Sequence, residues 1–192
     1  LKNDLSFVKE SNIGGEFMSE DKKQRINDIS NYKWKPNGKM QNFLSENEVY
    51  NLTIPRGTLT PEERQVINDH IVVTINMLDE LPYPKHLKNI PEFAGGHHEK
   101  LDGTGYPKGL TKNEMSVQAR IMAIADIFEA LTARDRPYKK GKTLSQAMRI
   151  LGFMKDDAHI DVDLFDIFVK KKIYMKYAKG FLEPEQIDEV SI

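Results

Sequence analysis

The sequence predicts an all-α fold, and three observations support that prediction. Apolar residues recur at three- and four-residue steps in several segments, most clearly from Ser116 to about Ala133. Helix-start signals precede such segments: in Thr60-Pro61-Glu62-Glu63 a capping residue is followed by a proline and two acids. No segment shows the sustained apolar–polar alternation that is typical of a strand. We therefore expect a helical bundle.

The N-terminal part is expected to contain two helices and a long connection. The first runs from Leu1 to about Ser11 with Leu1, Leu5 and Val8 on one side, and the glycines of Asn12-Ile13-Gly14-Gly15 end it. Ser19 caps a second helix that reaches about Tyr32. Residues 33–59 lack a helical period and contain two proline–glycine turns, so we expect a connection that wraps the core.

Five further helices are predicted after residue 59. The first begins at Thr60, with Glu63 as its capping partner, and ends before Pro82. Its inward stripe is expected to comprise Val66, Ile67, His70, Ile71, Thr74, Met77 and Leu78. The helix over 116–133 should bury Ile121, Ile124, Ala125, Phe128 and Leu131. The other helices are expected over residues 84–95, 143–154 and 162–179.

Composition excludes several classes of protein and site. The net charge of −1 provides no global basic field for DNA or RNA. The absence of cysteine excludes disulfides, iron–sulfur clusters and thiolate zinc, and it fits a cytoplasmic protein. A charged fraction of 30% and the lack of a long apolar run exclude a membrane span in this chain.

The most informative segment is His97-His98-Glu99-Lys100-Leu101-Asp102-Gly103-Thr104-Gly105-Tyr106-Pro107. Imidazole and carboxylate groups suit iron, manganese, nickel or zinc. Adjacent histidines cannot share one helix face, but they can approach a metal centre from a loop or a helix end. A zinc-protease motif is rejected, because H-E-x-x-H requires a continuous helix and Asp102 here opens a glycine-rich turn.

Two further residues are candidate ligands. His70 lies on the predicted inward stripe, where a lone histidine is more often a core residue than a ligand. Asp126 lies among mostly apolar neighbours, and a buried carboxylate is costly unless it is paired or metal-bound. The structural alternative for Asp126 is a salt bridge to Arg120 or Arg149. Together with His97 and His98, these residues supply four candidate ligands from three elements.

The chain resembles the HD-GYP phosphodiesterases, which are metal-dependent hydrolases of the bacterial second messenger cyclic di-GMP. The histidine motif, the segment from Leu59 to His70 and the helix around Asp126 support the resemblance, which covers roughly residues 58–151. It implies an all-α bundle of the HD-domain superfamily type that binds two or more divalent metals. Iron or manganese fits such ligands best, while zinc and nickel remain open.

The resemblance also assigns site residues. His70, His97, His98 and Asp126 would be metal ligands, and the last three would form the catalytic centre. Arg136 and Lys139 would contact substrate phosphates or guanine bases, and Gly105, Tyr106 and Pro107 would shape the mouth of the site. For the basic run that contains Arg136 and Lys139, a solvated surface segment is the structural alternative.

One part of the family pattern is missing. No histidine is followed by aspartate, so the resemblance is to the C-terminal half of the domain, with the bundle incomplete at its N-terminal side. Either the His-Asp helix precedes Leu1 and the chain is a fragment, or the protein is a natural variant without it. The start at Leu1 favours a fragment, which is expected to expose apolar helix faces and to form oligomers. We expect residues 60–192 to hold this C-terminal half and residues 1–59 to belong to the same catalytic unit.

The expected activity is hydrolysis of cyclic di-GMP to the linear dinucleotide or GMP by the complete protein; the fragment alone could lack activity. Three alternatives stay open: a module that binds a cyclic dinucleotide without cleaving it, a phosphohydrolase of another nucleotide, and a helical module that docks onto a partner. The resemblance also allows a sensory domain upstream.

Overall fold

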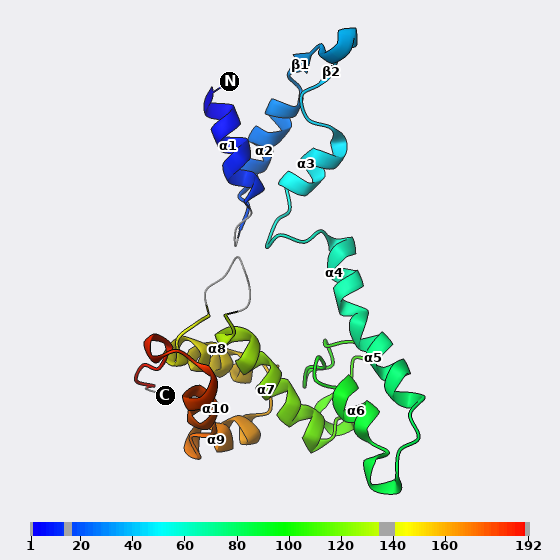
Figure 1. The fold of residues 1–192 in the computed structure, drawn as a ribbon, viewed down its shortest axis with the longest axis vertical. Coiled ribbons are helices and arrows are strands. Elements are labelled where there is room, and N and C mark those ends of the chain that lie inside the picture. Colours follow the sequence, from blue (N-terminus) through cyan, green and yellow to red (C-terminus); the bar gives the residue numbers. More distant parts are fainter. Residues whose placement is uncertain (1, 14–16, 135–140, 191–192) are drawn as a thin grey trace. The chain divides into compact units, whose positions relative to one another are not determined.

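The computed structural model describes residues 2–13, 17–134 and 141–190 of the chain. These residues form two compact units, Leu1–Ile67 and Asn68–Ile192, each of which is described by itself. Both are built almost wholly from helices, which confirms the predicted all-α class (Figure 1).

In the first unit, three helices surround a small apolar cluster. These are α1 (Lys2–Asn12), α2 (Glu20–Ser30) and α3 (Glu46–Leu52), and the buried residues of the cluster are Ile26, Ile29, Leu44 and Leu52. Ser19 caps α2 as predicted, accepting a hydrogen bond from the Lys22 backbone N–H. The predicted face of α1 is wrong for Leu5, which is 51% exposed, because Phe7 joins Val8 against the cluster instead. Leu1 lies outside the described residues.

The expected long connection contains ordered elements that the periodicity did not show. A short antiparallel hairpin pairs β1 (Lys33–Trp34) with β2 (Gln41–Asn42) across the 3-10 turn η1 (Pro36–Gly38). α3 follows, and its start is fixed by reciprocal hydrogen bonds between Ser45 and Glu48. A Ser-x-x-Glu signal was therefore present in the sequence ahead of a helix too short to show a period.

The predicted helix over residues 60–81 begins as expected but is divided in two. The Thr60 N–H donates to Glu63 Oε2 at 2.9 Å, and the Glu63 N–H donates to Thr60 Oγ1 at 3.2 Å. α4 (Pro61–Asn68) and α5 (His70–Asp79) are separated at Asp69. The predicted inward stripe is wrong for most of its members: Ile71 is fully buried, whereas the exposed residues are Val66, Ile67, His70 and Met77.

The second unit places its main core around α7, α8, α9 and α10. The elements are α5, η2 (Lys85–Leu87), α6 (Ile90–Gly95), η3 (Lys112–Glu114), α7 (Val117–Thr132), α8 (Leu144–Asp156), α9 (Val162–Lys170), α10 (Ile173–Phe181) and η4 (Pro184–Gln186). The largest buried side chains of this core include Phe128, Leu144, Met148, Leu151 and Phe165. Ser116, Thr143 and Asp161 cap α7, α8 and α9 through their side-chain oxygens.

Two of the predicted helices in this unit differ from the structure. The helix expected over 162–179 is two helices, because Lys172 adopts the left-handed conformation (φ 50°, ψ 40°) and ends the regular hydrogen bonding. The helix expected over 84–95 is a 3-10 turn followed by the short α6. In neither place did the residue pattern contain a glycine that would have marked the break.

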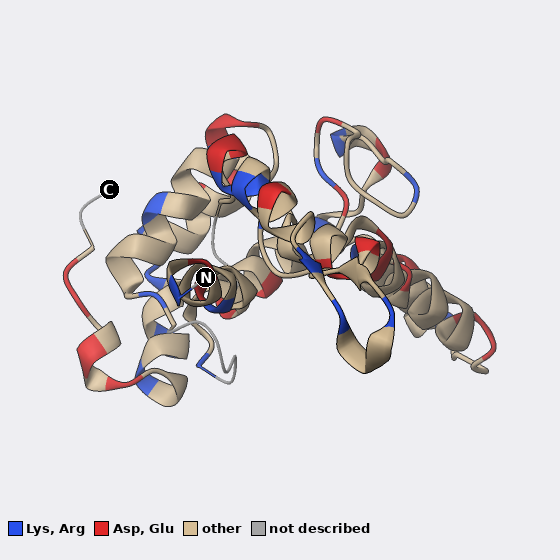
Figure 2. Cartoon of the chain, turned by 90° about the horizontal axis from the view of Figure 1, so that it is seen from above, with Lys and Arg blue, Asp and Glu red and all other residues tan. Residues whose placement is uncertain are grey.

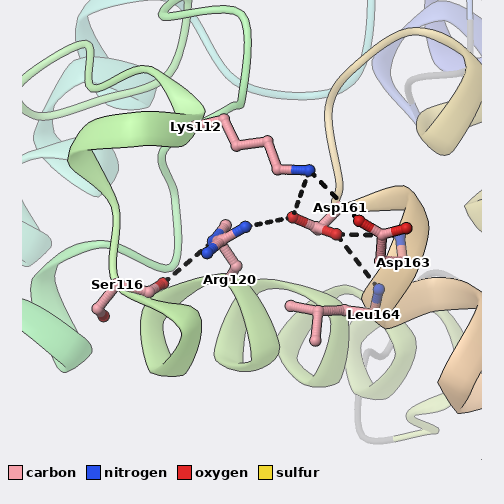
Figure 3. A network of polar contacts seen from close by, with 6 residues as sticks. All are labelled: Lys112, Ser116, Arg120, Asp161, Asp163 and Leu164. Atoms are coloured by element: carbon pink, nitrogen blue, oxygen red, sulfur yellow. Dashed lines mark hydrogen bonds and ion pairs between the residues drawn. The ribbon is translucent and has the colours of Figure 1, made fainter.

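A buried aspartate joins three elements of the second unit (Figure 3). Asp161, 1% exposed, accepts from Arg120 Nη1 of α7 at 2.5 Å and lies 3.2 Å from Lys112 Nζ of η3. Its second oxygen accepts the backbone N–H groups of Asp163 and Leu164 at the start of α9. Burial by itself would raise the pKa of Asp161, but these hydrogen bonds and cations outweigh it and lower the pKa.

We predict that Asp161→Ala lowers the free energy of unfolding of the second unit by about 3 kcal/mol, because it removes a helix cap and leaves the Arg120 charge without its buried partner. Asp163→Ala is the matched control, since the Asp163 side chain is 86% exposed and its carboxylate lies 3.7 Å from Lys112 Nζ; its effect should stay within about 0.5 kcal/mol. Chemical denaturation measures both, and equal losses in the two variants would contradict the proposed role of the network.

Candidate metal centre

Three histidines converge in the second unit. His70 is the first residue of α5, and His97 and His98 lie in the turn after α6, which packs against α5. One ligand atom from each histidine lies within 4.8 Å of the other two. The Nε2 atoms of His70 and His98 are 3.4 Å apart. Three imidazoles gathered in this way can hold a divalent transition metal.

The orientation of His97 is fixed by its own chain. Its Nδ1 lies 2.5 Å from the carbonyl oxygen of Ala94 in the preceding helix. Since a carbonyl only accepts, Nδ1 carries the proton, which leaves Nε2 as the ring nitrogen that can bind a metal. A backbone partner on the second ring nitrogen is the arrangement typical of a metal-ligating histidine.

His98 is held in its neutral form. Burial lowers its pKa to about 4, the neighbouring charges of His97 and His70 act in the same direction, and the negative charge of Asp126 opposes them. At neutral pH the imidazole therefore needs to lose no proton before it binds a metal. His70 is exposed, so the expectation that it lies on a buried stripe is wrong, and the core-histidine alternative loses its basis.

Asp126 is near this group but is not buried. α7 turns Ala119, Ala123, Ile124 and Phe128 into the core, and the face that carries Ile121, Ala125 and Asp126 is exposed, which corrects the predicted stripe. Among the described residues Asp126 forms no ion pair, and Arg120 pairs with Asp161 instead. The Asp126 charge nevertheless acts on both His98 and Tyr106. In the described chain, the three-histidine group does not include it.

Glu99 is the site residue that sequence reasoning did not assign. Its side chain is 1% exposed and accepts two backbone hydrogen bonds, from Lys108 N–H at 2.7 Å and from Leu110 N–H at 2.9 Å. Both donors lie beyond the glycine-rich turn. The carboxylate of Glu99, the residue directly after His98, therefore holds the two ends of the loop together. Its place directly after two candidate ligands gave no signal of this role, and only the fold shows that both of its oxygens are used by the loop.

The closed loop sets Tyr106 beside His98. The Tyr106 N–H donates to the His98 carbonyl at 3.3 Å, and the two rings stack with centroids 4.8 Å apart and planes 17° from parallel. Gly105 makes the turn possible, because a Cβ there would lie 2.3 Å from the Lys100 nitrogen. The Tyr106–Pro107 peptide is cis. Gly105, Tyr106 and Pro107 thus form a loop beside the histidines, and that they shape the mouth of a substrate site stays a prediction.

Three residues singled out in the sequence remain, namely Asp102, Arg136 and Lys139. Asp102 accepts hydrogen bonds from both the backbone and the hydroxyl of Thr104, so it is a turn residue. The helix before the motif ends at Gly95, and residues 97–102 are not helical, which agrees with the rejection of a zinc-protease motif. Arg136 and Lys139 lie outside the described residues.

Comparison with protein families shows which family the chain belongs to. Residues 46–164, more than half of the chain, match the family described as the HD domain. The chain belongs to the HD-domain family. This confirms the superfamily that the sequence predicted and agrees with the helical fold. It also places the three histidines, Glu99 and Asp126 inside the matched HD-domain segment.

Relatives of this HD-domain chain are named as phosphodiesterases. The 3'3'-cGAMP-specific phosphodiesterase 3 of Vibrio cholerae is 38% identical over 107 residues, 56% of this chain and 22% of that protein. A cyclic di-GMP phosphodiesterase of Thermotoga maritima is 41% identical over 93 residues, 48% of this chain and 25% of that protein. The cyclic di-GMP phosphodiesterase response regulator RpfG of Xanthomonas campestris is 36% identical over 95 residues, 50% of this chain and 25% of that protein. The chain thus spans about a quarter of the length of these relatives.

In residues 2–13, 17–134 and 141–190, no helix has the length and apolar content that a bilayer span needs.

We predict that Glu99→Gln loosens the loop without unfolding the unit, because the amide offers only one acceptor and turns its NH2 group toward a backbone donor. Hydrogen exchange at the Lys108 and Leu110 amides should quicken by roughly 10- to 100-fold, equivalent to about 1–3 kcal/mol of local opening. Glu114→Gln provides the control, because this carboxylate accepts comparable hydrogen bonds from Thr111 in an exposed position. Unchanged protection in the Glu99 variant would show that the carboxylate does not hold the loop.

Proposed function

We propose that this chain is the metal-binding part of a phosphodiesterase that, in the complete protein, hydrolyses a cyclic dinucleotide. The observation that carries the proposal is the group of His70, His97 and His98, whose ligand atoms lie within 4.8 Å of one another beside a loop closed by Glu99. Membership of the HD-domain family and the phosphodiesterase names of the relatives support it.

The proposed metal ligands are His70, His97, His98 and Asp126. The three imidazoles fit the centre as they stand, and the exposed Asp126 carboxylate on α7 lies where its charge acts on His98. Two or more ions are proposed, with iron or manganese favoured by the mixture of imidazole and carboxylate. When bound, such ions supply an activated water and neutralise the charge of phosphodiester oxygens.

The chain's own residues prepare the site for that chemistry. The Ala94 carbonyl holds the His97 ring with Nε2 available, and burial keeps His98 neutral, so neither ligand has to reorganise. Tyr106, stacked on His98, provides an aromatic wall against which a guanine base could pack. Arg136 and Lys139 are proposed to contact the phosphates or bases of the substrate, following the family resemblance.

Cyclic di-GMP is the proposed substrate, since relatives from Thermotoga maritima and Xanthomonas campestris carry it in their names. The name of the Vibrio cholerae relative supports 3'3'-cGAMP as a second candidate. Both are cyclic dinucleotides with two phosphodiesters, so the same metal centre would serve either. The proposal also includes residues 1–59 as part of the catalytic unit, an upstream sensory domain, self-association and a cytoplasmic location.

In the complete protein, His97→Ala should lower hydrolysis of cyclic di-GMP by more than about 100-fold, since losing a ligand exceeds the 10- to 100-fold cost of losing a partner behind one. His86→Ala is the control, because His86 lies in η2 and is not part of the three-histidine group. Product formation and metal content are measured together for both variants, and 3'3'-cGAMP is tested in parallel.

Equal turnover by the His97 variant and the parent would contradict the ligand assignment. Tight binding of cyclic di-GMP by the complete metal-loaded protein without any product would replace the enzyme with a nucleotide-binding module. Metal binding without binding or cleavage of either cyclic dinucleotide would favour another nucleotide as the substrate.

A further inference from the structure

The β1–β2 hairpin of the first unit carries exposed apolar side chains that the proposed function does not use. Trp34 is 46% exposed, Met40 66% and Phe43, directly after the hairpin, 40%. Trp34 is the single tryptophan of the chain. The hairpin also precedes residue 46, where the match to the HD domain begins. Neither the family nor the metal centre therefore accounts for these side chains.

The same hairpin is strongly basic. Lys33, Lys35 and Lys39 lie in a stretch without any acidic residue between Asp28 and Glu46. Within the described ranges none of the three lysines forms an ion pair, and Lys33 is bonded only to the neutral side chain of Asn42. Figure 2 shows blue and tan segments along the hairpin and no red. Three positive charges thus flank the exposed tryptophan without an internal partner.

Trp34 is exposed although it lies in an ordered β-hairpin. Its indole N–H donates to the Asn42 carbonyl at 3.1 Å, and its ring meets the Phe43 ring edge-on with centroids 6.4 Å apart. Asn37 and Gly38 adopt left-handed conformations that turn the chain tightly between the strands. The ring is therefore presented to solvent without an unsatisfied donor, so moving it into a less polar layer would leave no hydrogen bond unmade.

We propose that this hairpin docks the protein onto an anionic lipid surface. Tryptophan is favoured at the level of lipid headgroups, and lysines beside it are attracted to anionic headgroups. A protein partner is the weaker choice, because a stable protein interface uses about 20–30 residues a side. A hairpin of two-residue strands offers far fewer, whereas a deformable lipid surface requires no complementary groove.

The single tryptophan makes the proposal directly measurable in the whole chain. Vesicles of about three parts phosphatidylcholine to one part phosphatidylserine should shift the tryptophan emission to the blue and sediment the protein. Vesicles of phosphatidylcholine alone should do neither to a comparable extent. Brominated lipids in the anionic vesicles should quench the emission, since the ring would lie in the headgroup layer.

A triple variant, Lys33→Gln with Lys35→Gln and Lys39→Gln, tests the charges. Each lysine near an anionic surface contributes about 1 kcal/mol, or roughly fivefold in partition, so binding should fall by about 100-fold. The matched control changes Lys171, Lys176 and Lys179 to glutamine; these exposed residues lie in or beside α10, and the change in net charge is the same. This control should bind nearly as well as the parent.

Three results would overturn the proposal. They are an unchanged emission spectrum with anionic vesicles, equal binding to neutral and anionic vesicles, and equal losses in the two triple variants. The last would show that only the net charge of the chain matters. A blue shift caused by a soluble acidic protein but not by vesicles would instead assign the hairpin to a protein partner.

Discussion

The candidate site depends on the burial of one carboxylate, Glu99. A carboxylate removed from water is stable only when its oxygens are hydrogen-bonded, and here two backbone N–H groups from beyond the turn meet that need. The chain beyond the turn must therefore fold back onto Glu99, the residue directly after His98. Closure brings the backbone at Gly105 so near Lys100 that no larger residue fits, and it sets the ring of Tyr106 against His98. The arrangement of the loop around the histidines is thus a consequence of satisfying a buried carboxylate.

A second buried carboxylate, that of Asp161, links the helices around the site to one another. Asp161 joins η3, which directly follows the loop, to Arg120 on α7 and to the start of α9. The same α7 that carries Arg120 also carries Asp126, about 1.7 turns further along. The position of Asp126 relative to the loop is therefore coupled to a network whose members are not candidate ligands. A protein that gathers ligands from separate elements needs such supports, because the groups behind the ligands orient them.

The sequence predicted the fold class, the capped starts at Ser19 and Thr60, and the gathering of His70 with His97 and His98. These features have local signals: caps require particular side chains, and the motif is contiguous. Burial was predicted less well. Periodicity identified helices but not which of their faces would be covered, so His70 and Asp126 were placed inward and lie exposed. The role of Glu99 could not be predicted either, because its partners are backbone groups nine and eleven residues away. The breaks at Asp69 and Lys172 lacked the usual glycine or proline.

The most direct test of the account is long-range proton–nitrogen correlation spectroscopy of the histidine side chains during titration of the chain with zinc, a diamagnetic ion that suits imidazole. The chain has five histidines, and the two outside the group, His86 and His159, serve as controls. We predict that Nε2 of His70, His97 and His98 shift together at one stoichiometry, that Nδ1 of His97 stays protonated, and that His86 and His159 do not respond. Shifts at His86 or His159, or a response from only one of the three clustered histidines, would contradict the central claim that this fold assembles a metal centre.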